Sequence, residues 1–533
     1  MMNLNNQGER FMKKTSADKT ILTTAIILAL SVIGTSMYYA ARATWVFVDI
    51  TVNIEKFTFI LLYVMIINAA LLGILLYCGL KNRNLYNNKC YKTVNIISLI
   101  IALVLFVAAM VFAVIMATDE SSEVFWLYFE NSVFNAVVFT MLLFLALFYP
   151  FLKEKARKVV IIFVVVFAGL YMFNEFSPIK PYKFTSEPMI INTGIDYSVV
   201  FSTSDSGTGY VEYNWKGKSY KVYDADGGRL NSKSKIHSVN VPYEHLDNNS
   251  YKIGSVRVLE QYSYGSNTGK EIVSEEYSFN FNDNDELTYL VVSDWHTYKD
   301  KAYDAVSYVG EYDAVILMGD SSPGVDMEEQ AINNIVEFAG ELTKGIKPVL
   351  YVRGNHETRG EYAGELLDAL GLNEFYYTVD IGSCTFIALD SGEDKDDSHP
   401  EYGGMTDYNT YRTDMISWLE NVEVENKNVI ALSHSWKISD VEKELSEKGW
   451  NEIDRLGASL MISGHTHKCR LIGEADDEKE ILSHHPEITG YMDGGNSADN
   501  YIASKMVVNN KGIELSAYSN FGEKVFEHSL NWR

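Results

Sequence analysis

Five short motifs in the C-terminal half of the chain carry side chains that can hold metal ions or move protons. In chain order they are Asp-x-His at 294–296, Gly-Asp at 319–320, Gly-Asn-His-Glu at 354–357, a single His at 434 and Gly-His-x-His at 464–467. Carboxylate, imidazole and amide groups bind divalent and transition metals, and imidazole is also the commonest general acid or base. These motifs can form one site only if the fold brings them together.

Each motif directly follows a short apolar run, at residues 287–292, 314–318, 349–352, 429–432 and 460–462. Apolar runs of this length between polar segments predict strands of a buried, largely parallel sheet. In open α/β sheets the ligand-binding groups lie at the carboxyl ends of the strands. A single histidine at such a position is usually structural. Five of the eleven histidines in one ordered set instead predict one functional site.

This ordered set, spread over residues 287–470, resembles the calcineurin-like metallophosphoesterase superfamily. The resemblance implies a four-layer α/β/β/α sandwich with two mixed sheets and the metal ions at one end. It also implies two ligand sets that share a bridging Asp320: metal one takes Asp294, His296, Asp320 and His467, and metal two takes Asp320, Asn355, His434 and His465. Nitrogen and oxygen ligands of this kind suit Mn, Fe, Zn or Co.

The activity that the resemblance implies is hydrolysis of phosphate mono- or diesters. Two adjacent cations would lower the pKa of a bridging water, and the resulting hydroxide would attack phosphorus. His356 matches the histidine that stabilises or protonates the leaving oxygen. Arg353 and Glu357 are nearby candidates for contacts with phosphate or with the ligands. Three further histidines lie in long acidic loops and are left outside the predicted site: His399, His484 and His485.

The chain departs from two branches of this superfamily after Asp320, where it reads Ser-Ser-Pro-Gly. Purple acid phosphatases have a metal-binding tyrosine at the position of Pro323, so a ferric, coloured site is not expected. Ser/Thr protein phosphatases have an Asp and then an Arg here. These departures leave one alternative open, a non-catalytic receptor or scaffold that keeps the fold for binding. The complete ligand set argues for the enzyme.

The segment 179–285 contains alternating polar and apolar runs, such as those at 197–203, 210–215 and 251–259, separated by turn-forming sequences. Short strands at this spacing predict an all-β sandwich. The order of TGYVEY, IHSVNVP and SEEYSFNF resembles the fibronectin-III-like N-terminal domain of purple acid phosphatases. We expect His237 and His245 to lie on its surface. The catalytic domain is then predicted to span 286–533.

Residues 1–178 are predicted to form an α-helical transmembrane region. Five apolar segments are long enough to cross a bilayer: 21–41, 57–80, 94–117, 132–151 and 159–176. Lys and Arg precede the first segment and separate the second from the third and the fourth from the fifth, whereas acidic residues separate the third from the fourth. This asymmetry predicts a multi-pass protein of the cell membrane, with a cytoplasmic N-terminus and an extracytoplasmic catalytic domain. A transporter with an accessory domain would need polar, paired residues within the spans, and the sequence does not show them.

The charge of the chain limits the classes of partner it can bind, and its cysteine content limits its disulfides. Residues 1–178 hold 14 Lys and Arg against 10 Asp and Glu, which leaves 31 against 60 of the totals of 45 and 70 for the remainder. So acidic a portion is not expected to bind nucleic acid, and the expected partners are a phosphoester substrate and the lipid bilayer. The four cysteines predict no disulfide framework. Whether Cys384 and Cys469 pair is left open.

Overall fold

The computed structural model of the 533-residue chain describes residues 159, 181–262, 265–281, 286–426, 428–497 and 500–533. The chain divides into two compact units, Met1–Lys180 and Pro181–Arg533, and the fold below is that of the second. The five predicted spans, at 21–41, 57–80, 94–117, 132–151 and 159–176, lie outside the described residues except for Val159. Among the described residues, no helix has the length and apolar character needed to cross a membrane.

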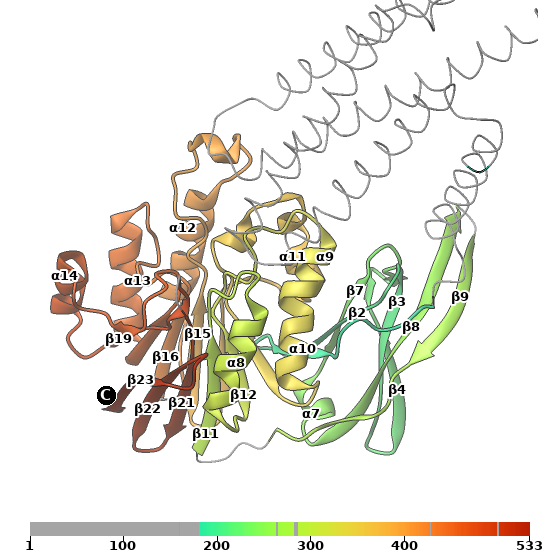
Figure 1. The fold of residues 1–533 in the computed structure, drawn as a ribbon, viewed down its shortest axis with the longest axis horizontal. Helices are drawn as coiled ribbons and strands as arrows, with labels where there is room; N and C mark the ends of the chain where they lie inside the picture. The colour runs from blue at the N-terminus through green and yellow to red at the C-terminus, as the bar shows by residue number, and fades with distance from the viewer. Residues whose placement is uncertain (1–158, 160–180, 263–264, 282–285, 427, 498–499) are drawn as a thin grey trace, which may run out of the picture. The chain divides into compact units, whose positions relative to one another are not determined.

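The larger of the two central sheets has ten strands and is mixed (Figure 1). In spatial order these are β23 (Lys524–Asn531), β22 (Gly512–Ser519), β21 (Tyr501–Asn509), β11 (Glu286–Val292), β12 (Ala314–Leu317), β13 (Pro348–Tyr351), β1 (Met189–Asn192), β2 (Tyr197–Ser202) and β7 (Ile236–Val241), with β20 (Gly495–Asn496) paired to β21. β11, β12, β13 and β1 are parallel neighbours. Because both faces of these strands are covered, their sequences are continuously apolar.

The second sheet has six strands, also mixed. In spatial order these are β14 (Tyr377–Ile381), β15 (Cys384–Leu389), β16 (Asn428–Ser433), β17 (Ala458–Ser463), β19 (Thr489–Met492) and β18 (Arg470–Leu471). Alternate residues of the two sheets meet in one buried cluster, which includes Val291 of β11 and Phe386 of β15. The two sheets therefore pack face to face.

Helices cover the outer face of each sheet. Against the ten-stranded sheet pack α8 (Lys299–Val309), α9 (Glu328–Ala331), the π-helical turn η4 (Ile332–Val336), α10 (Glu337–Thr343) and α11 (Leu366–Ala369). Against the six-stranded sheet pack α12 (Tyr408–Glu420), α13 (Lys443–Arg455) and α14 (Asp476–His484). Three short 3₁₀ turns lie in the connections: η5 (His356–Thr358), η6 (Glu361–Gly364) and η7 (Pro400–Tyr402). The predicted α/β/β/α layering of the catalytic part, with mixed sheets, is confirmed.

The predicted sandwich segment is divided between two sheets. Its strands β1, β2 and β7 extend the ten-stranded sheet, because β1 pairs in parallel with β13. The other main strands form a separate five-stranded sheet: β3 (Gly207–Trp215), β4 (Lys218–Tyr223), β8 (Asn249–Tyr262), β9 (Gly265–Val273) and β10 (Tyr277–Phe279). The connections contain α7 (Tyr243–Leu246) and the small β5 (Ala225–Asp226) and β6 (Arg229–Leu230) pair.

The five-stranded sheet packs on the β1–β2–β7 end of the larger sheet through one apolar cluster, which includes Phe201, Val211 and Ile253. Two layers do face each other here, but one of them belongs to the catalytic sheet. The predicted boundary at residue 285 therefore does not separate two compact units of the described chain. The fibronectin-III-like assignment stays a prediction.

Two expectations for individual side chains in this region were wrong. His237 is fully buried, with Nε2 3.1 Å from Thr203 Oγ1 and Nδ1 3.6 Å from the Asp224 carboxylate. His245 is partly buried, since its Nδ1 lies 2.9 Å from the Tyr213 hydroxyl and its ring packs on Trp215. His237 shares the buried face of β7 with Val239 and Val241, whereas His245 lies on α7. Cys384 and Cys469 are free thiols.

Candidate metal centre

The loops that follow β11, β12 and β17 hold five predicted ligands in an unusual backbone conformation. These residues have positive φ angles between 45° and 67°: Asp294, His296, Asp320, His465 and His467. For residues with a β-carbon this conformation costs about 1–2 kcal/mol each. Such strain is typical of functional sites and persists only where surrounding contacts enforce it.

Backbone hydrogen bonds between the loops enforce this geometry. Asp294 N donates to Gly319 O and His296 N donates to Asp320 O, both at 2.9 Å. His465 N donates to the Asp294 carboxylate, 3.0 Å from Oδ2. The loops after β11, β12 and β17 are therefore tied together at one end of the two sheets.

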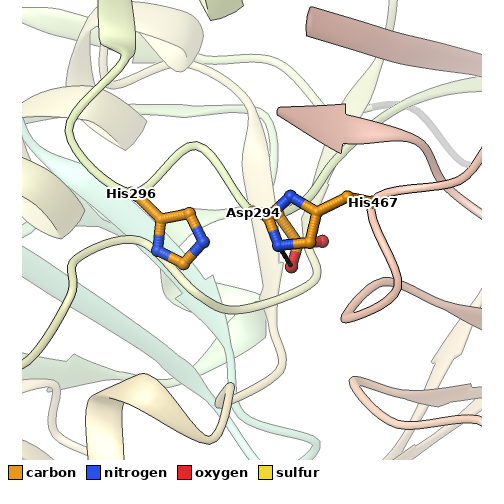
Figure 2. A group of neighbouring side chains, drawn as sticks. All are labelled: Asp294, His296 and His467. Carbon is orange, nitrogen blue, oxygen red and sulfur yellow. Dashed lines mark ion pairs between the residues drawn. The ribbon is translucent and has the colours of Figure 1, made fainter. Parts of the chain in front are cut away.

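The predicted ligands come together in two groups of three. Asp294, His296 and His467 form one, and Figure 2 shows these side chains facing one another from the loops after β11 and β17. Asp320, His434 and His465 form the other. Within each group the possible ligand atoms all lie within 4.8 Å of one another. In the first group His467 Nε2 is 3.6 Å from Asp294 Oδ1, and in the second His434 Nε2 is 3.2 Å from Asp320 Oδ2.

Asn355 lies beside the second group, with its Oδ1 3.1 Å from His465 Nδ1. Asp320 belongs to the second group and touches the first through its backbone, because its carbonyl accepts the hydrogen bond from His296 N. The structure thus brings all seven predicted ligands to one end of the sheets. The bridging role of Asp320 stays a prediction.

Hydrogen bonds behind the histidines orient their rings. His434 Nδ1 lies 2.6 Å from Met318 O, and His467 Nδ1 contacts Asn496 O. A carbonyl can only accept, so each Nδ1 carries a hydrogen and each Nε2 faces the carboxylates. Within the described part of the chain, His434 Nε2 is buried and makes no well-aligned hydrogen bond, although it lies 3.2 Å from Asp320 Oδ2. A buried nitrogen held in this way, beside carboxylate oxygens, fits a metal ligand.

The buried side chains of His434 and Asp320 strongly shift each other's pKa. Burial opposes the charge of His434, but the carboxylate of Asp320 raises its pKa to about 10. Burial also opposes the charge of Asp320, yet His434, His356 and His296 hold its pKa well below the ordinary value. A proton on His434 would have to leave before Nε2 could bind a metal ion, so metal binding here releases protons.

His296 shows the opposite shift. Burial lowers its pKa to about 4, against the raising effect of Asp320. The ring is therefore neutral at neutral pH and offers a lone pair, the form of imidazole that binds metals. The first group is thus ready to bind a cation without first losing a proton from His296.

His356, the predicted acid, lies on η5 next to both groups. Its Nε2 is 3.9 Å from Asp320 Oδ2, and its ring centre is 4.9 Å from that of His296. Its Nδ1 lies 3.0 Å from Pro323 O, which directs Nε2 toward the ligands. The side chain is 27% exposed and is accessible to a substrate. Its catalytic role stays a prediction.

The two weaker candidates, Glu357 and Arg353, are buried and bind other parts of the protein. Glu357 is fully buried, and its carboxylate accepts hydrogen bonds from Asp320 N, from Gly354 N and from the backbone and hydroxyl of Ser321. Arg353 is buried against Phe375 and pairs with Asp390 at 2.6 Å. Glu357 thus joins two ligand loops, and the guanidinium of Arg353 is held by Asp390 in the protein interior. His399, His484 and His485 belong to neither ligand group, and His485 pairs with Asp454.

Sequence reasoning missed a carboxylate beneath the first group. Asp493 follows β19 and accepts hydrogen bonds from Ser293 Oγ at 3.0 Å and Ser504 Oγ at 2.5 Å. Burial raises its pKa to about 7. The next residues support the site too, because Asn496 N donates to Asp294 O at 3.2 Å. The signal was present, since Asp493 follows an apolar strand as the ligands do, but it lacks a neighbouring histidine.

Comparison with known proteins agrees with this geometry. Residues 287–469 match the family model of the calcineurin-like phosphoesterases, so this part of the chain is a calcineurin-like metallophosphoesterase domain. No curated protein matches the chain.

Several solved structures are similar to part of the chain. GAP50, the anchor in the inner membrane complex of Plasmodium, is 15% identical with a TM-score of 0.34, over 46% of this chain and 89% of that one. A predicted phosphoesterase of Streptococcus pneumoniae is 14% identical with a TM-score of 0.23, over 46% and 98%. The Escherichia coli phosphoesterase Yfce is 16% identical with a TM-score of 0.23, over 46% and 100%.

Proposed function

We propose that this chain is a membrane-anchored phosphoesterase that hydrolyses phosphate mono- or diesters outside the cytoplasm with the help of two metal ions. The observation that carries the proposal is the convergence of two groups of ligand side chains at one end of the two sheets, Asp294, His296, His467 and Asp320, His434, His465. The match of this region to the calcineurin-like phosphoesterases supports the same reaction class.

Some residues of the site would bind the metal ions, and His356 would act on the leaving oxygen. Bound metal ions would acidify water and neutralise the oxygens of the phosphoryl group. Asp294 and Asp320 would supply negative charge to hold the cations, and the ring nitrogens of His296 and His467 would complete one group. His356 is placed to stabilise or protonate the leaving oxygen, since its Nε2 faces the ligands and its ring is accessible.

Hydrolysis of para-nitrophenyl phosphate and of its bis-ester by the full-length chain tests the proposal. The protein is first stripped with a chelator and then given Mn, Zn, Fe or Co. We expect activity only after metal is restored, and a loss of at least about 100-fold in Asn355→Ala and His434→Ala, since even residues that only support the ligands contribute 10- to 100-fold. His484→Ala removes an exposed histidine elsewhere and should leave activity unchanged.

Two other outcomes are informative. Two bound metals with no turnover of either ester would favour the non-catalytic receptor or scaffold, the alternative suggested by Ser321 to Gly324. Activity that survives chelation and both ligand variants would contradict the metal site itself.

The membrane anchor and the extracytoplasmic position rest on the five apolar segments between residues 21 and 176 and on the Lys and Arg between them. Protease added to intact cells that express the chain should cleave the part after residue 180. Cleavage only after the cells are opened would place the catalytic domain in the cytoplasm and contradict this part of the proposal.

A further inference from the structure

A guanidinium group that sequence reasoning did not select lies beside the predicted acid. Arg359 immediately follows η5, and its backbone N donates to His356 O at 3.2 Å. Its own carbonyl accepts from Val325 N at 2.7 Å, which ties it to the loop after β12. The backbone of Arg359 is therefore held by two of the loops that carry ligands.

A buried carboxylate fixes the direction of this guanidinium. Nε and Nη2 of Arg359 both bind Glu393, whose side chain is only 1% exposed, and Nη2 also lies 3.4 Å from Asp394. Glu393 accepts further hydrogen bonds from Thr358 Oγ1 at 3.1 Å and from the Tyr402 hydroxyl at 2.7 Å. Such a two-pronged pair sets the plane of the guanidinium as well as its position.

The remaining nitrogen is turned toward the metal centre. Arg359 Nη1 lies 3.3 Å from His356 Nε2, the atom that faces Asp320. Because arginine can only donate, His356 Nε2 accepts in this contact, and a charged N–H group of Arg359 lies beside the two ligand groups. The Arg359 side chain is 29% exposed, so a substrate can reach it.

We propose that Arg359 is a substrate-binding residue whose Nη1 donates to a non-bridging phosphoryl oxygen, and that it makes the site prefer phosphate monoesters to diesters. This inference rests on the proposed phosphoesterase function. If bound metal ions took two oxygens of a monoester dianion, one charged oxygen would remain for the guanidinium. In a diester that third position is an ester oxygen, which is uncharged and a weaker acceptor.

A purely structural role predicts something different. If Arg359 only tied the loop of Glu393 to η5, its loss would lower stability and would affect both ester classes alike. Arg359→Lys separates the two roles. Lysine keeps a positive charge for the buried Glu393 but has no second terminal nitrogen that can reach His356 Nε2 at the same time.

The test compares the full-length wild type, Arg359→Lys and Arg359→Gln on para-nitrophenyl phosphate and its bis-ester, at equal metal content. Loss of a hydrogen bond to a charged oxygen should lower kcat/KM for the monoester roughly tenfold to hundredfold. The diester value should fall no more than about fivefold, the size of a screened charge effect. Lys443→Gln removes an exposed charge on α13 and serves as the matched control. A parallel fall for both esters, or no fall, overturns the proposal.

Binding of inorganic phosphate to the metal-loaded protein, measured by calorimetry, makes the result independent of turnover. We expect both Arg359 variants to bind phosphate roughly tenfold or more weakly than the wild type and the Lys443→Gln control. Equal affinities, or a wild type that does not bind phosphate, would overturn the role of Arg359. If the wild type binds phosphate through Arg359 but hydrolyses neither ester, the proposed function fails while the assignment of Arg359 as a phosphate contact stands.

Discussion

Glu357 belongs to neither ligand group, but its contacts hold two of the ligand loops in place. Its buried carboxylate receives hydrogen bonds from the loop after β12, at Asp320 and Ser321, and from the loop after β13, at Gly354. These two loops carry ligands of both kinds, carboxylate and amide. The position of Asp320 relative to Asn355 therefore depends on Glu357.

We predict that Glu357→Gln weakens metal binding by roughly tenfold to hundredfold, the usual effect of losing a residue that orients ligands. The amide has the same shape, but its NH₂ group would face N–H donors. At least one buried N–H donor would then lose its acceptor, and each such loss costs about 1–3 kcal/mol of stability. Metal titration and thermal unfolding of the full-length chain measure both effects. Glu361→Gln, an exposed carboxylate on the neighbouring η6, is the matched control. Wild-type metal affinity in Glu357→Gln would contradict this role.

At the residue scale, the ligands could be predicted because their signal is local. Each predicted ligand stands within a few residues of an apolar strand, and a short motif records that proximity. The partners of Arg353, Glu357 and Asp493 could not be predicted in this way. Arg353 pairs with Asp390 and Asp493 binds Ser293, contacts that only the folded chain creates. A charged residue next to a motif can therefore be mistaken for a substrate contact when, in the folded chain, it pairs with another residue of the protein.

At the scale of elements, two glycines allow the loops after β12 and β13 to approach each other. Gly319 has a φ of +85°, and a β-carbon there would lie 2.4 Å from Gly354 N. A β-carbon on Gly354 would lie 2.2 Å from Asp320 Oδ1. The loops can thus pass at backbone distance only because neither residue carries a side chain.

Gly319→Ala and Gly457→Ala form a matched pair that separates conformational strain from steric exclusion. Gly457 has nearly the same φ, +82°, but a β-carbon there would meet nothing within 4 Å. We expect Gly457→Ala to cost about 1–2 kcal/mol of unfolding free energy. Gly319→Ala should cost about 1–3 kcal/mol more, because the loops must move apart.

Denaturant unfolding of the full-length variants measures these costs, and metal content gives a second readout. Gly319→Ala should also lose metal, since Gly319 O positions Asp294 N at 2.9 Å. Gly457→Ala should keep its metals. Equal destabilisation of the two variants, with metals retained in both, would show that the close approach of the loops has no role in the site.

The elements themselves were largely predictable in the catalytic part. Continuously apolar runs such as 287–292 and 429–432 became β11 and β16, buried on both faces. The ordered motifs, through the family resemblance, implied how the layers stack. The strands of the segment 181–285 were also recognisable, since 197–203 contains β2 and 210–215 lies within β3. Their alternation could not show which sheet each strand would join, because pairing partners depend on distant parts of the chain.

At the scale of the whole described unit, β1 joins what the sequence suggested were two domains. Ile190 and Ile191 are neighbours on this strand, and both are fully buried. Ile190 packs in the cluster beneath the five-stranded sheet, whereas Ile191 packs in the cluster beneath the catalytic helices. Ile191 is also paired with Val349 of β13, one strand away from the loop that carries Asp320. Loss of packing on either face of β1 should therefore destabilise both the five-stranded sheet and the catalytic part.

We predict that Ile190→Ala and Ile191→Ala each lower the stability of the whole unit Pro181–Arg533 by about 2–5 kcal/mol. Hydrogen exchange of the full-length chain at increasing denaturant resolves the segments. Peptides from β3 and β8 and peptides from β11 and β12 should lose protection at one common denaturant concentration, and each variant should shift all of them together. Ile195→Ala, at a side chain that is 71% exposed in the β1–β2 turn, should change stability by no more than about 0.5 kcal/mol. If Ile190→Ala shifted β3 and β8 while β11 and β12 kept their wild-type protection, the shared sheet would join two independently folding domains, and the division at residue 285 would hold energetically although the strands pair across it.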